Sequence, residues 1–371
     1  MKILIVGAGM AGAVISRELA EAGHSVTIID RRPHIAGNCY DEVNENGERI
    51  HIWGPHLLHS SADSVGVKWL SQFTEWTEYR HKVRARLSNG KSVPIPVNAE
   101  TMETIFDIKL ETEEDAKRFL HTQQVEITNP VNSDEVFLRS VGEKMADILF
   151  RPYTERHWGK PATEIEASVG ARIPVRFDRN DEYFNDSFQA LPTNGYTEMF
   201  QNIFNHPNIE TRLGEKFERR MMEGFDHVFT AQSPDSFFDY ELGRLPYRSV
   251  KFLHDKVWGN QEAPVVNFTE GSPYNRRTQY DLLPNSGKSA LPYHTAIYEI
   301  PCNAEENNNE CFYPIRNSET VSMHEAYIEK ATQEFPNVSF VGRTGNYVYE
   351  DMIPSVCRHL QIVRKFLNGI H

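Results

Sequence analysis

A glycine-rich segment near the N-terminus has the spacing of a phosphate-binding loop. It reads Gly7-Ala8-Gly9-Met10-Ala11-Gly12. In such loops the first glycine allows a tight turn, the second lets backbone N–H groups approach a pyrophosphate, and the third lets a helix pack against a strand. Asp30 follows at the distance at which an acid binds ribose hydroxyls. The pattern therefore predicts a dinucleotide at the N-terminus of a helix.

The residues that follow Asp30 favour FAD over NAD. Arg31 opens a basic segment that reaches a glycine turn and Asn38, as in the second fingerprint of flavin oxidoreductases. That turn usually has two glycines, and Ala36 replaces the first of them here. Near the C-terminus, Gly342-Arg343 precedes Asp351, and a GR…D segment of this type commonly closes over a flavin.

Two histidines in a Gly-Pro loop, His56 and His59, are candidates for the flavin side of an active site. A neutral imidazole can exchange a hydrogen bond with flavin N5 or with a sugar hydroxyl. The alternative is that both histidines are structural.

Arginines interleaved with aromatic residues are typical of nucleotide sites, because rings stack on a base and guanidinium groups bind phosphate oxygens. Three segments have this composition: FRPYTERHWG at 150–159, RIPVRFDRNDEYFN at 172–185 and SPYNRR at 272–277. Tyr313 and Tyr349 add hydroxyl groups near the C-terminal flavin segment. Taken alone, these segments could equally be a charged surface with core tyrosines.

Hydrophobic periodicity predicts the elements that position these residues. Apolar runs at 2–6 and 25–29 predict buried strands, and apolar residues at helical spacing over 11–22 predict the helix between them. Alternation over 82–97 around Asn89-Gly90 predicts a hairpin. Further predictions are helices at 67–80, within 99–160 and at 352–369, short strands between 209 and 315, and a strand at 338–342.

The composition bounds the class of protein. A chain of 371 residues is longer than one hydrophobic core usually serves, so several subdomains are expected. A net charge of −13 argues against nucleic acid or an anionic membrane as partner. We expect no membrane insertion and no signal peptide, because no apolar run is long enough and the first residues read as a strand. The four cysteines lack metal spacing, which predicts reduced thiols, a cytoplasmic location and no metal.

Taken together, these segments resemble the UDP-galactopyranose mutases of the bacterial type, nearly end to end. The resemblance rests on the order of DRRPHIAGNCYD, WGPHLLH, YTERHWG, RIPVRFDRNDEYFN, FQALPTNGYTEM, GRLPYRS, FYPIRN and GRTGNYVYEDM. It implies an α/β fold, with a Rossmann-like FAD-binding domain, a helical subdomain and an antiparallel-sheet substrate subdomain. The implied divisions are an FAD-binding domain in three parts (1–80, 209–245, 316–371), a hairpin connection (81–98), a helical subdomain (99–160), a mobile loop and sheet subdomain (161–208) and a sheet subdomain (246–315).

The resemblance also implies a reaction. This family interconverts UDP-galactopyranose and UDP-galactofuranose without net redox change, for the synthesis of cell-surface polysaccharide. N5 of the reduced flavin displaces UDP from the anomeric carbon, and the covalent flavin N5–sugar adduct opens and recloses before UDP returns. The implied cofactor is FAD, reduced by NADH, NADPH or a chemical reductant, and the implied assembly is a homodimer.

Roles carry over to matching positions. Arg172 on the mobile loop and Arg276 would bind the diphosphate with Tyr183, Tyr313 and Tyr349, and Trp158 would lie near the sugar. Leu149, Tyr153, Thr154 and Asn267 fall at uridine-side positions. The catalytic group would be Arg172, Arg276, His56, His59 and Tyr349. The cofactor would be bound by Gly7, Gly9, Ala11, Gly12, Asp30, Arg31, Asn38, His56, Arg343, Tyr349, Asp351 and Met352.

The departures from the family pattern lie around the base and the sugar. Leu149 replaces a phenylalanine, His81 an asparagine, and Arg277 an apolar residue. The histidine loop differs as well, with Trp53 in place of tyrosine. The nucleotide sugar could therefore be a dTDP-6-deoxyhexose or UDP-N-acetylgalactosamine. Alternatives of other classes are an amine-oxidase-like FAD oxidoreductase and a non-catalytic FAD-binding protein.

Overall fold

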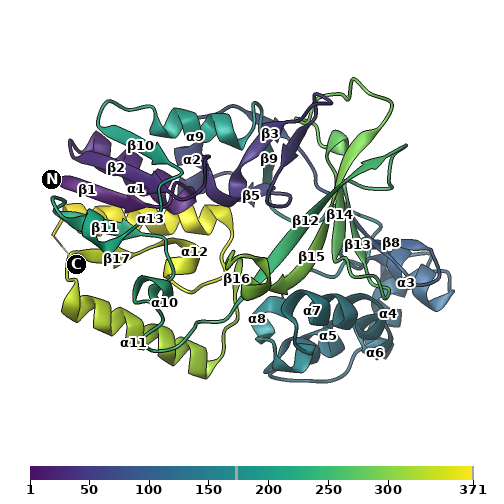
Figure 1. The fold of residues 1–371 in the computed structure, drawn as a ribbon. Coiled ribbons are helices and arrows are strands. Elements are labelled where there is room, and N and C mark those ends of the chain that lie inside the picture. Colours follow the sequence, from purple (N-terminus) through teal and green to yellow (C-terminus); the bar gives the residue numbers. More distant parts are fainter. Residues whose placement is uncertain (172–173, 370–371) are drawn as a thin grey trace.

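A five-stranded parallel sheet forms the first half of the molecule, which we call the Rossmann-like domain (Figure 1). The computed structural model describes residues 1–171 and 174–369. The strands lie in the order β10 (Ile209–Leu213), β2 (Ser25–Asp30), β1 (Lys2–Val6), β11 (His227–Thr230) and β17 (Val338–Phe340). The central strands are buried on both faces, as their continuous apolar runs predict. The predicted strand–turn–helix–strand unit is confirmed by α1 (Met10–Glu21) between β1 and β2.

Helices that are distant in sequence cover this sheet together. α1 packs against α13 (Met352–Leu367) and α9 (Tyr196–Phe204), and all three contribute to one hydrophobic core. α11 (Ser318–Glu334) and the short helices α10 (Pro234–Phe237) and α12 (Gly342–Gly345) complete the domain. Among the described residues, no helix is long and apolar enough to cross a membrane.

A seven-stranded sheet forms the second half, and its pairing is antiparallel except for one parallel pair, β13–β7. The order is β16 (Tyr313–Pro314), β12 (Tyr247–Val257), β15 (His294–Asn303), β14 (Arg276–Gln279), β13 (Val265–Phe268), β7 (Val83–Arg86) and β8 (Ser92–Ile95). The predicted hairpin is confirmed as β7–β8, where Gly90 takes the positive φ of +80° that the turn needs. The hairpin forms one edge of this sheet.

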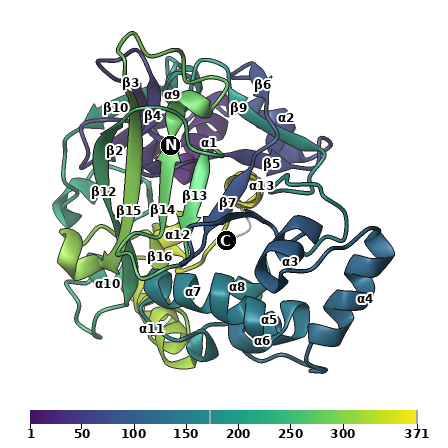
Figure 2. The ribbon, with the colours of Figure 1, turned by 90° about the vertical axis from the view of Figure 1, so that its right-hand side faces the viewer.

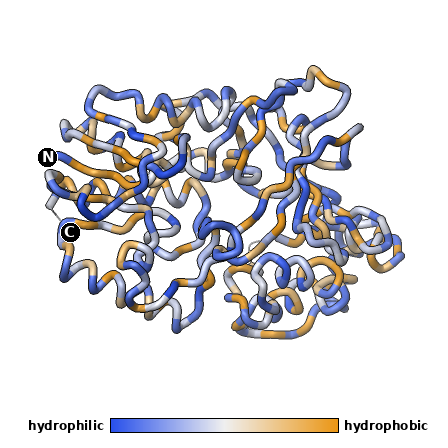
Figure 3. Tube along the Cα trace, viewed as in Figure 1, coloured by the Kyte–Doolittle hydropathy of each residue, from blue (hydrophilic) through white to orange (hydrophobic). Residues whose placement is uncertain are grey.

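A cluster of helices lies below the seven-stranded sheet in Figure 2 and confirms the predicted helical subdomain. It comprises α3 (Ala99–Phe106), α4 (Glu113–Gln123), α5 (Ser133–Val141), α6 (Glu143–Met145), α7 (Arg151–Trp158) and α8 (Ala167–Gly170). Asn98, Thr112 and Asn132 begin the longer helices, because each side chain accepts a backbone N–H of the first turn. Figure 3 shows hydrophobic stretches in this part as well as in the Rossmann-like domain, and each has its own core.

Two sequence-based expectations were wrong. The helix predicted for 67–80 is α2 (Val65–Leu70) followed by β6 (Trp76–Glu78), which lies with β5 (Leu58–Ser60) and β9 (Phe188–Pro192) in a three-stranded sheet. The segment 188–208, expected in the sheet subdomain, instead packs on the Rossmann-like domain. The reason is that α9 buries one apolar face against α1. A last hairpin joins β3 (Asp41–Val43) to β4 (Arg49–His51).

Candidate active site

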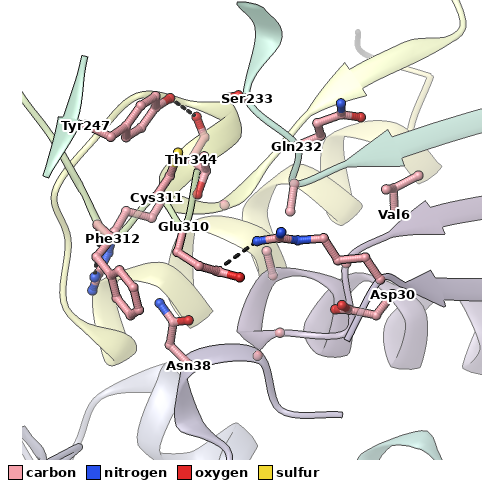
Figure 4. Close-up of a pocket in the computed structure, with 18 of the residues that line it drawn as sticks. Val6, Asp30, Asn38, Gln232, Ser233, Tyr247, Glu310, Cys311, Phe312 and Thr344 are labelled. Atoms are coloured by element: carbon pink, nitrogen blue, oxygen red, sulfur yellow. Dashed lines mark hydrogen bonds and ion pairs between the residues drawn. The ribbon is translucent and has the colours of Figure 1, made fainter. Parts of the chain in front are cut away.

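A cavity of about 530 Å³ opens at the carboxyl ends of the parallel strands. Val6 ends β1 and Asp30 ends β2, and both line this space (Figure 4). Ala231, which directly follows β11, lines it as well. Ligands of open α/β sheets bind at this edge. We call this space the dinucleotide cavity. Of the residues predicted to bind a cofactor, all but Tyr349 line it.

The glycines of the first turn serve two different purposes. Gly7 has a φ of +114°, and a Cβ on Gly12 would lie 2.0 Å from the Gly7 carbonyl oxygen, so the chain itself requires both glycines. Gly9 has an extended backbone, and its Cβ would meet only Gly37 Cα, at an ordinary 3.7 Å. The protein gives no reason for a glycine there, whereas close approach of a pyrophosphate does. This turn therefore fits a dinucleotide.

Charged groups surround the ends of the cavity. The carboxylate of Asp30 accepts the backbone N–H groups of Ala8 at 2.8 Å and Arg32 at 2.9 Å. Glu310, labelled in Figure 4, reaches over from the loop before β16 and pairs with Arg31 at 2.8 Å and Arg32 at 2.6 Å. Arg32 also donates to Asn38. The basic segment after β2 is thus held in place by the second half of the molecule.

Two helix N-termini face the dinucleotide cavity. α1 begins at Met10 and α13 begins at Met352, and both residues line the space, as does Asp351 before α13. Helix N-termini carry partial positive charge and unpaired N–H groups, so together they favour an anionic ligand. Arg343 adds a full charge and is anchored by its hydrogen bond to the Glu350 carbonyl at 2.9 Å.

The predicted histidine loop separates into two environments. His56 lines the dinucleotide cavity, and its Nδ1–H donates to the Gly54 carbonyl at 2.9 Å, which leaves Nε2 as an acceptor. Burial, followed by nearby positive groups, lowers the pKa of His56 to about 3, so the ring is neutral. His59 does not line this cavity. It stacks on Phe184, with ring centroids 3.7 Å apart, and its Nδ1 lies 2.8 Å from Asp186.

Beside this cavity lies a group of aromatic rings around one arginine, which we call the aromatic–arginine cluster. It consists of Tyr153, His157 and Trp158 on α7, Tyr313 on β16, Tyr349 after α12, and Arg276 on β14. Tyr313 is central, because its ring centroid lies 4.9 Å from that of His157 and 5.4 Å from that of Tyr349. The Arg343 guanidinium lies 5.2 Å from the Tyr349 ring centroid and so joins the cluster to the cavity.

Arg276 is the charged centre of this cluster. Its Nε lies 2.7 Å from the carboxylate of Glu299, whose side chain is 4% exposed. Burial acts to lower the pKa of Arg276, but the Glu299 carboxylate raises it well above the usual value. The same cation, after burial, lowers the pKa of His81 and of His157 to about 3. Arg276 is therefore a fixed cation beside neutral histidine rings.

The remaining predicted residues are placed as follows. Asn267 on β13 is the register partner of Arg276. Leu149 and Thr154 are buried, Leu149 in the core of the helical subdomain. Tyr183 lies edge-on to His81. Trp158 and Tyr349 line a second cavity of about 480 Å³ beside the first. Arg172 lies outside the described residues.

Sequence reasoning missed His157 and Glu299. His157 stood within the ERHWG segment but had no spacing to single it out. Glu299 had a signal, because a glutamate within the apolar strand AIYEI must find a cation if it is buried.

Metal-ligating side chains meet once in the described ranges 1–171 and 174–369, at Glu48, Asp281 and His294. His294 Nδ1 lies 3.2 Å from Glu48 and 3.1 Å from Asp281. An imidazole hydrogen-bonded between two carboxylates accounts for this arrangement, and we assign no metal to it.

The fold and the cavities together define a protein of the Rossmann-like dinucleotide-binding class, whose second half places an arginine among aromatic rings beside the dinucleotide cavity. Comparison with known proteins agrees. Residues 5–73 match the NAD(P)-binding Rossmann-like domain, and residues 148–349 match the UDP-galactopyranose mutase family. The chain belongs to the UDP-galactopyranose mutase family and is an enzyme of the mutase, or isomerase, type.

Relatives match over almost the whole chain. A probable UDP-galactopyranose mutase of Klebsiella pneumoniae is 34% identical over 373 residues, which cover 99% of this chain and 95% of the relative. A dTDP-fucopyranose mutase of Escherichia coli is 35% identical over 363 residues, with 95% and 94% covered. A crystal structure of reduced UDP-galactopyranose mutase has the same fold, with a TM-score of 0.74, 16% identity and 99% and 95% covered.

Proposed function

We propose that this chain is an FAD-dependent mutase that interconverts UDP-galactopyranose and UDP-galactofuranose. The observation that carries the proposal is the ion pair of the half-buried Arg276 with the buried Glu299 inside the aromatic–arginine cluster, directly beside the dinucleotide cavity. A guanidinium among tyrosines suits a diphosphate. An oxidase that takes hydride from an apolar substrate would have no use for it.

The residues of the dinucleotide cavity suit FAD. Gly9 and the start of α1 would approach its pyrophosphate, Asp30 its adenosine ribose, and Arg343 with the start of α13 its flavin end. FAD bound here and reduced, by NADH, NADPH or a chemical reductant, would supply a nucleophilic N5 for the displacement of UDP. His56 would present an acceptor Nε2 to that region without a charge.

The aromatic–arginine cluster would bind the rest of the substrate. Arg276, with Tyr313 and Tyr349, would hold the diphosphate of the leaving group near the reacting carbon. Burial raises the pKa of Tyr313 to about 12, so its hydroxyl stays protonated and can donate to phosphate oxygens. Arg172 would close on the same group.

A second candidate is a mutase for a dTDP-6-deoxyhexose. It is favoured by the Escherichia coli relative named as a dTDP-fucopyranose mutase. It is also favoured by Leu149 and His81, which depart from the family pattern at positions that the resemblance assigns to the surroundings of the base and the sugar.

One assay tests the proposal. Dithionite-reduced protein is incubated with UDP-galactofuranose or dTDP-fucofuranose, and the products are separated by HPLC. Conversion to the pyranose by reduced protein alone is expected, and the faster substrate identifies the nucleotide sugar. Reduction of the flavin by the substrate, with no isomerisation of either compound, would refute the proposed mutase function.

The assembly and location are also proposals. A homodimer and a cytoplasmic location follow from the family resemblance and from the cysteine pattern. Light scattering of the purified protein should give twice the chain mass of 42.7 kDa.

A further inference from the structure

His157 has a defined tautomer because of the residue behind it. Arg156 Nε–H donates to Asn275 Oδ1 at 2.9 Å, and a guanidinium can only donate. The other end of that amide is therefore the NH₂ group, which lies 3.0 Å from His157 Nδ1 and must donate to it. Since Nδ1 accepts, the proton of the neutral imidazole is on Nε2.

This arrangement is rigid. Asn275 is 1% exposed, and Arg156 is anchored by the backbone carbonyls of Phe268, Glu270 and Ser272. Arg248 holds the backbone carbonyl of His157 at 2.8 Å. The imidazole can therefore neither flip nor exchange its tautomer without breaking buried hydrogen bonds.

The Nε2–H of His157 is available to a ligand. Among the described residues it has no hydrogen-bond partner, and it is not one of the fully buried unpaired atoms. The ring lies parallel to that of Tyr153 and 4.9 Å from that of Tyr313, within the aromatic–arginine cluster. Arg276 is close enough for its charge to act on this ring. A neutral donor beside a fixed cation suits an oxygen that carries negative charge.

We propose that the Nε2–H of His157 donates a hydrogen bond to a diphosphate oxygen of the nucleotide sugar. Asn275 is then the positioning residue that holds the imidazole in the tautomer this bond requires. The inference rests on the proposed function, because it takes a nucleotide diphosphate sugar as the ligand of the cluster.

The first test measures binding rather than turnover. Oxidised, flavin-loaded protein is titrated calorimetrically with UDP, dTDP, UMP and dTMP. His157→Phe keeps a ring for the contacts with Tyr153 and Tyr313 but removes the donor. This variant should weaken binding of the preferred diphosphate about tenfold, which is the effect of one hydrogen bond to a charged group. The dissociation constant of the corresponding monophosphate should stay within about twofold of the wild-type value. The matched control is His121→Phe, at an exposed position on α4, which should change neither.

The second test changes the tautomer without touching the ring. In Asn275→Asp a carboxylate faces Nδ1, so Nδ1 takes a proton and the pKa of His157 rises from about 3. The affinity of this variant for the diphosphate is divided by that of wild type at each pH, so that the ionisation of the ligand cancels. This ratio should fall as the pH rises from 5.5 to 8, because the ring that loses its charge keeps the proton on Nδ1 and no longer donates from Nε2. In wild type the ring stays neutral throughout that range. The other ionisable groups facing the ring, Arg276, Arg248, Tyr153 and Tyr313, do not titrate there.

The outcomes separate the two ideas. If wild-type protein binds neither UDP nor dTDP, the proposed function itself fails. If wild type binds but His157→Phe binds equally well, or loses monophosphate and diphosphate alike, only the role of His157 is wrong. A flat pH profile for a folded, flavin-loaded Asn275→Asp protein would also overturn the role of His157. This pH experiment remains decisive even if His157→Phe does not fold.

Discussion

The dinucleotide cavity and the aromatic–arginine cluster adjoin one another but are built in different ways. The dinucleotide cavity depends on backbone: a glycine turn, two helix N-termini and strand ends, much of it from the first forty residues. The aromatic–arginine cluster depends on side chains from α7, β14 and β16, brought together only when the two halves of the molecule fold. A backbone site fails when a Cβ is added, and a side-chain site fails when a functional group is removed.

The largest effect is expected where the backbone meets the ligand, at Gly9→Ala. Its Cβ has room within the protein, so the folded chain should be unaffected, while the pyrophosphate is kept away. We expect FAD affinity to fall at least about 100-fold, with loss of all activity, because some 2.7 kcal/mol of binding is a modest estimate for a displaced pyrophosphate. Flavin absorbance after gel filtration measures this.

The controls for this variant separate ligand from chain. Gly271→Ala adds a Cβ in open space without strain and should keep both flavin and stability. Gly12→Ala should instead damage the fold, because its Cβ would meet the Gly7 carbonyl oxygen. A Gly9→Ala protein that keeps FAD would mean that the ligand does not approach this turn.

A substitution in the aromatic–arginine cluster should reduce turnover and leave flavin binding intact. Arg276→Lys keeps a cation near Glu299 but loses the planar fork that binds two phosphate oxygens at once. We expect kcat/KM to fall by about 10² to 10³, as for loss of a group that stabilises developing charge, with the flavin spectrum unchanged. Steady-state assays of reduced protein measure this.

The neighbouring arginine provides the control. Arg277 was expected around the base and the sugar, but it points to the other side of the strand from Arg276, where it donates to Gln261 at 2.6 Å. Arg277→Lys should therefore leave kcat/KM within about threefold, since it breaks only a partly exposed contact. Equal losses in the two variants would remove Arg276 from the diphosphate site.

The difference between a site built from backbone and a site built from distant side chains also decides what could be predicted from the sequence. The glycine turn, Asp30 and the first strands follow from contiguous residues, so local pattern was sufficient. Composition marked the segments 150–159 and 272–277 as candidates for a nucleotide site, but only the resemblance joined them in one cluster, because no local rule brings Tyr153 to Arg276. His157 was missed for that reason. The segment 188–208 was misplaced because an amphipathic helix shows that it buries a face but not against which partner.

Smaller effects on stability are expected from pH, through two buried histidines, His51 and His81. His51 and His81 are 1% and 3% exposed, and burial, followed by a nearby arginine, lowers the pKa of each to about 3. In the unfolded chain the ordinary pKa is about 6.5, so between these values the unfolded state binds more protons. Stability should be complete above pH 6.5 and fall as the pH decreases, by about 1.4 kcal/mol per pH unit for each histidine.

Urea unfolding between pH 4.5 and 7 measures this dependence. His81→Asn removes one such group and should reduce the slope by one proton. His121→Asn, at an exposed position, should leave the slope unchanged. If His81→Asn also leaves it unchanged, His81 is protonated in the folded protein.

The smallest effect is expected at Ala36→Gly, which restores the two-glycine turn of the flavin fingerprint. Ala36 adopts a φ of +71°, which costs an L-residue about 1 to 2 kcal/mol, but its fully buried methyl contributes about 0.8 kcal/mol and glycine adds chain entropy on unfolding. These effects nearly cancel, so the free energy of unfolding should change by less than about 1 kcal/mol, with FAD retained. Gly37→Ala should behave differently, because its Cβ would lie 2.9 Å from Gly9 Cα, in the turn that approaches the ligand. The backbone site thus needs the second glycine of this turn and tolerates replacement of the first, and parallel melting and flavin-occupancy measurements on the two variants test that distinction.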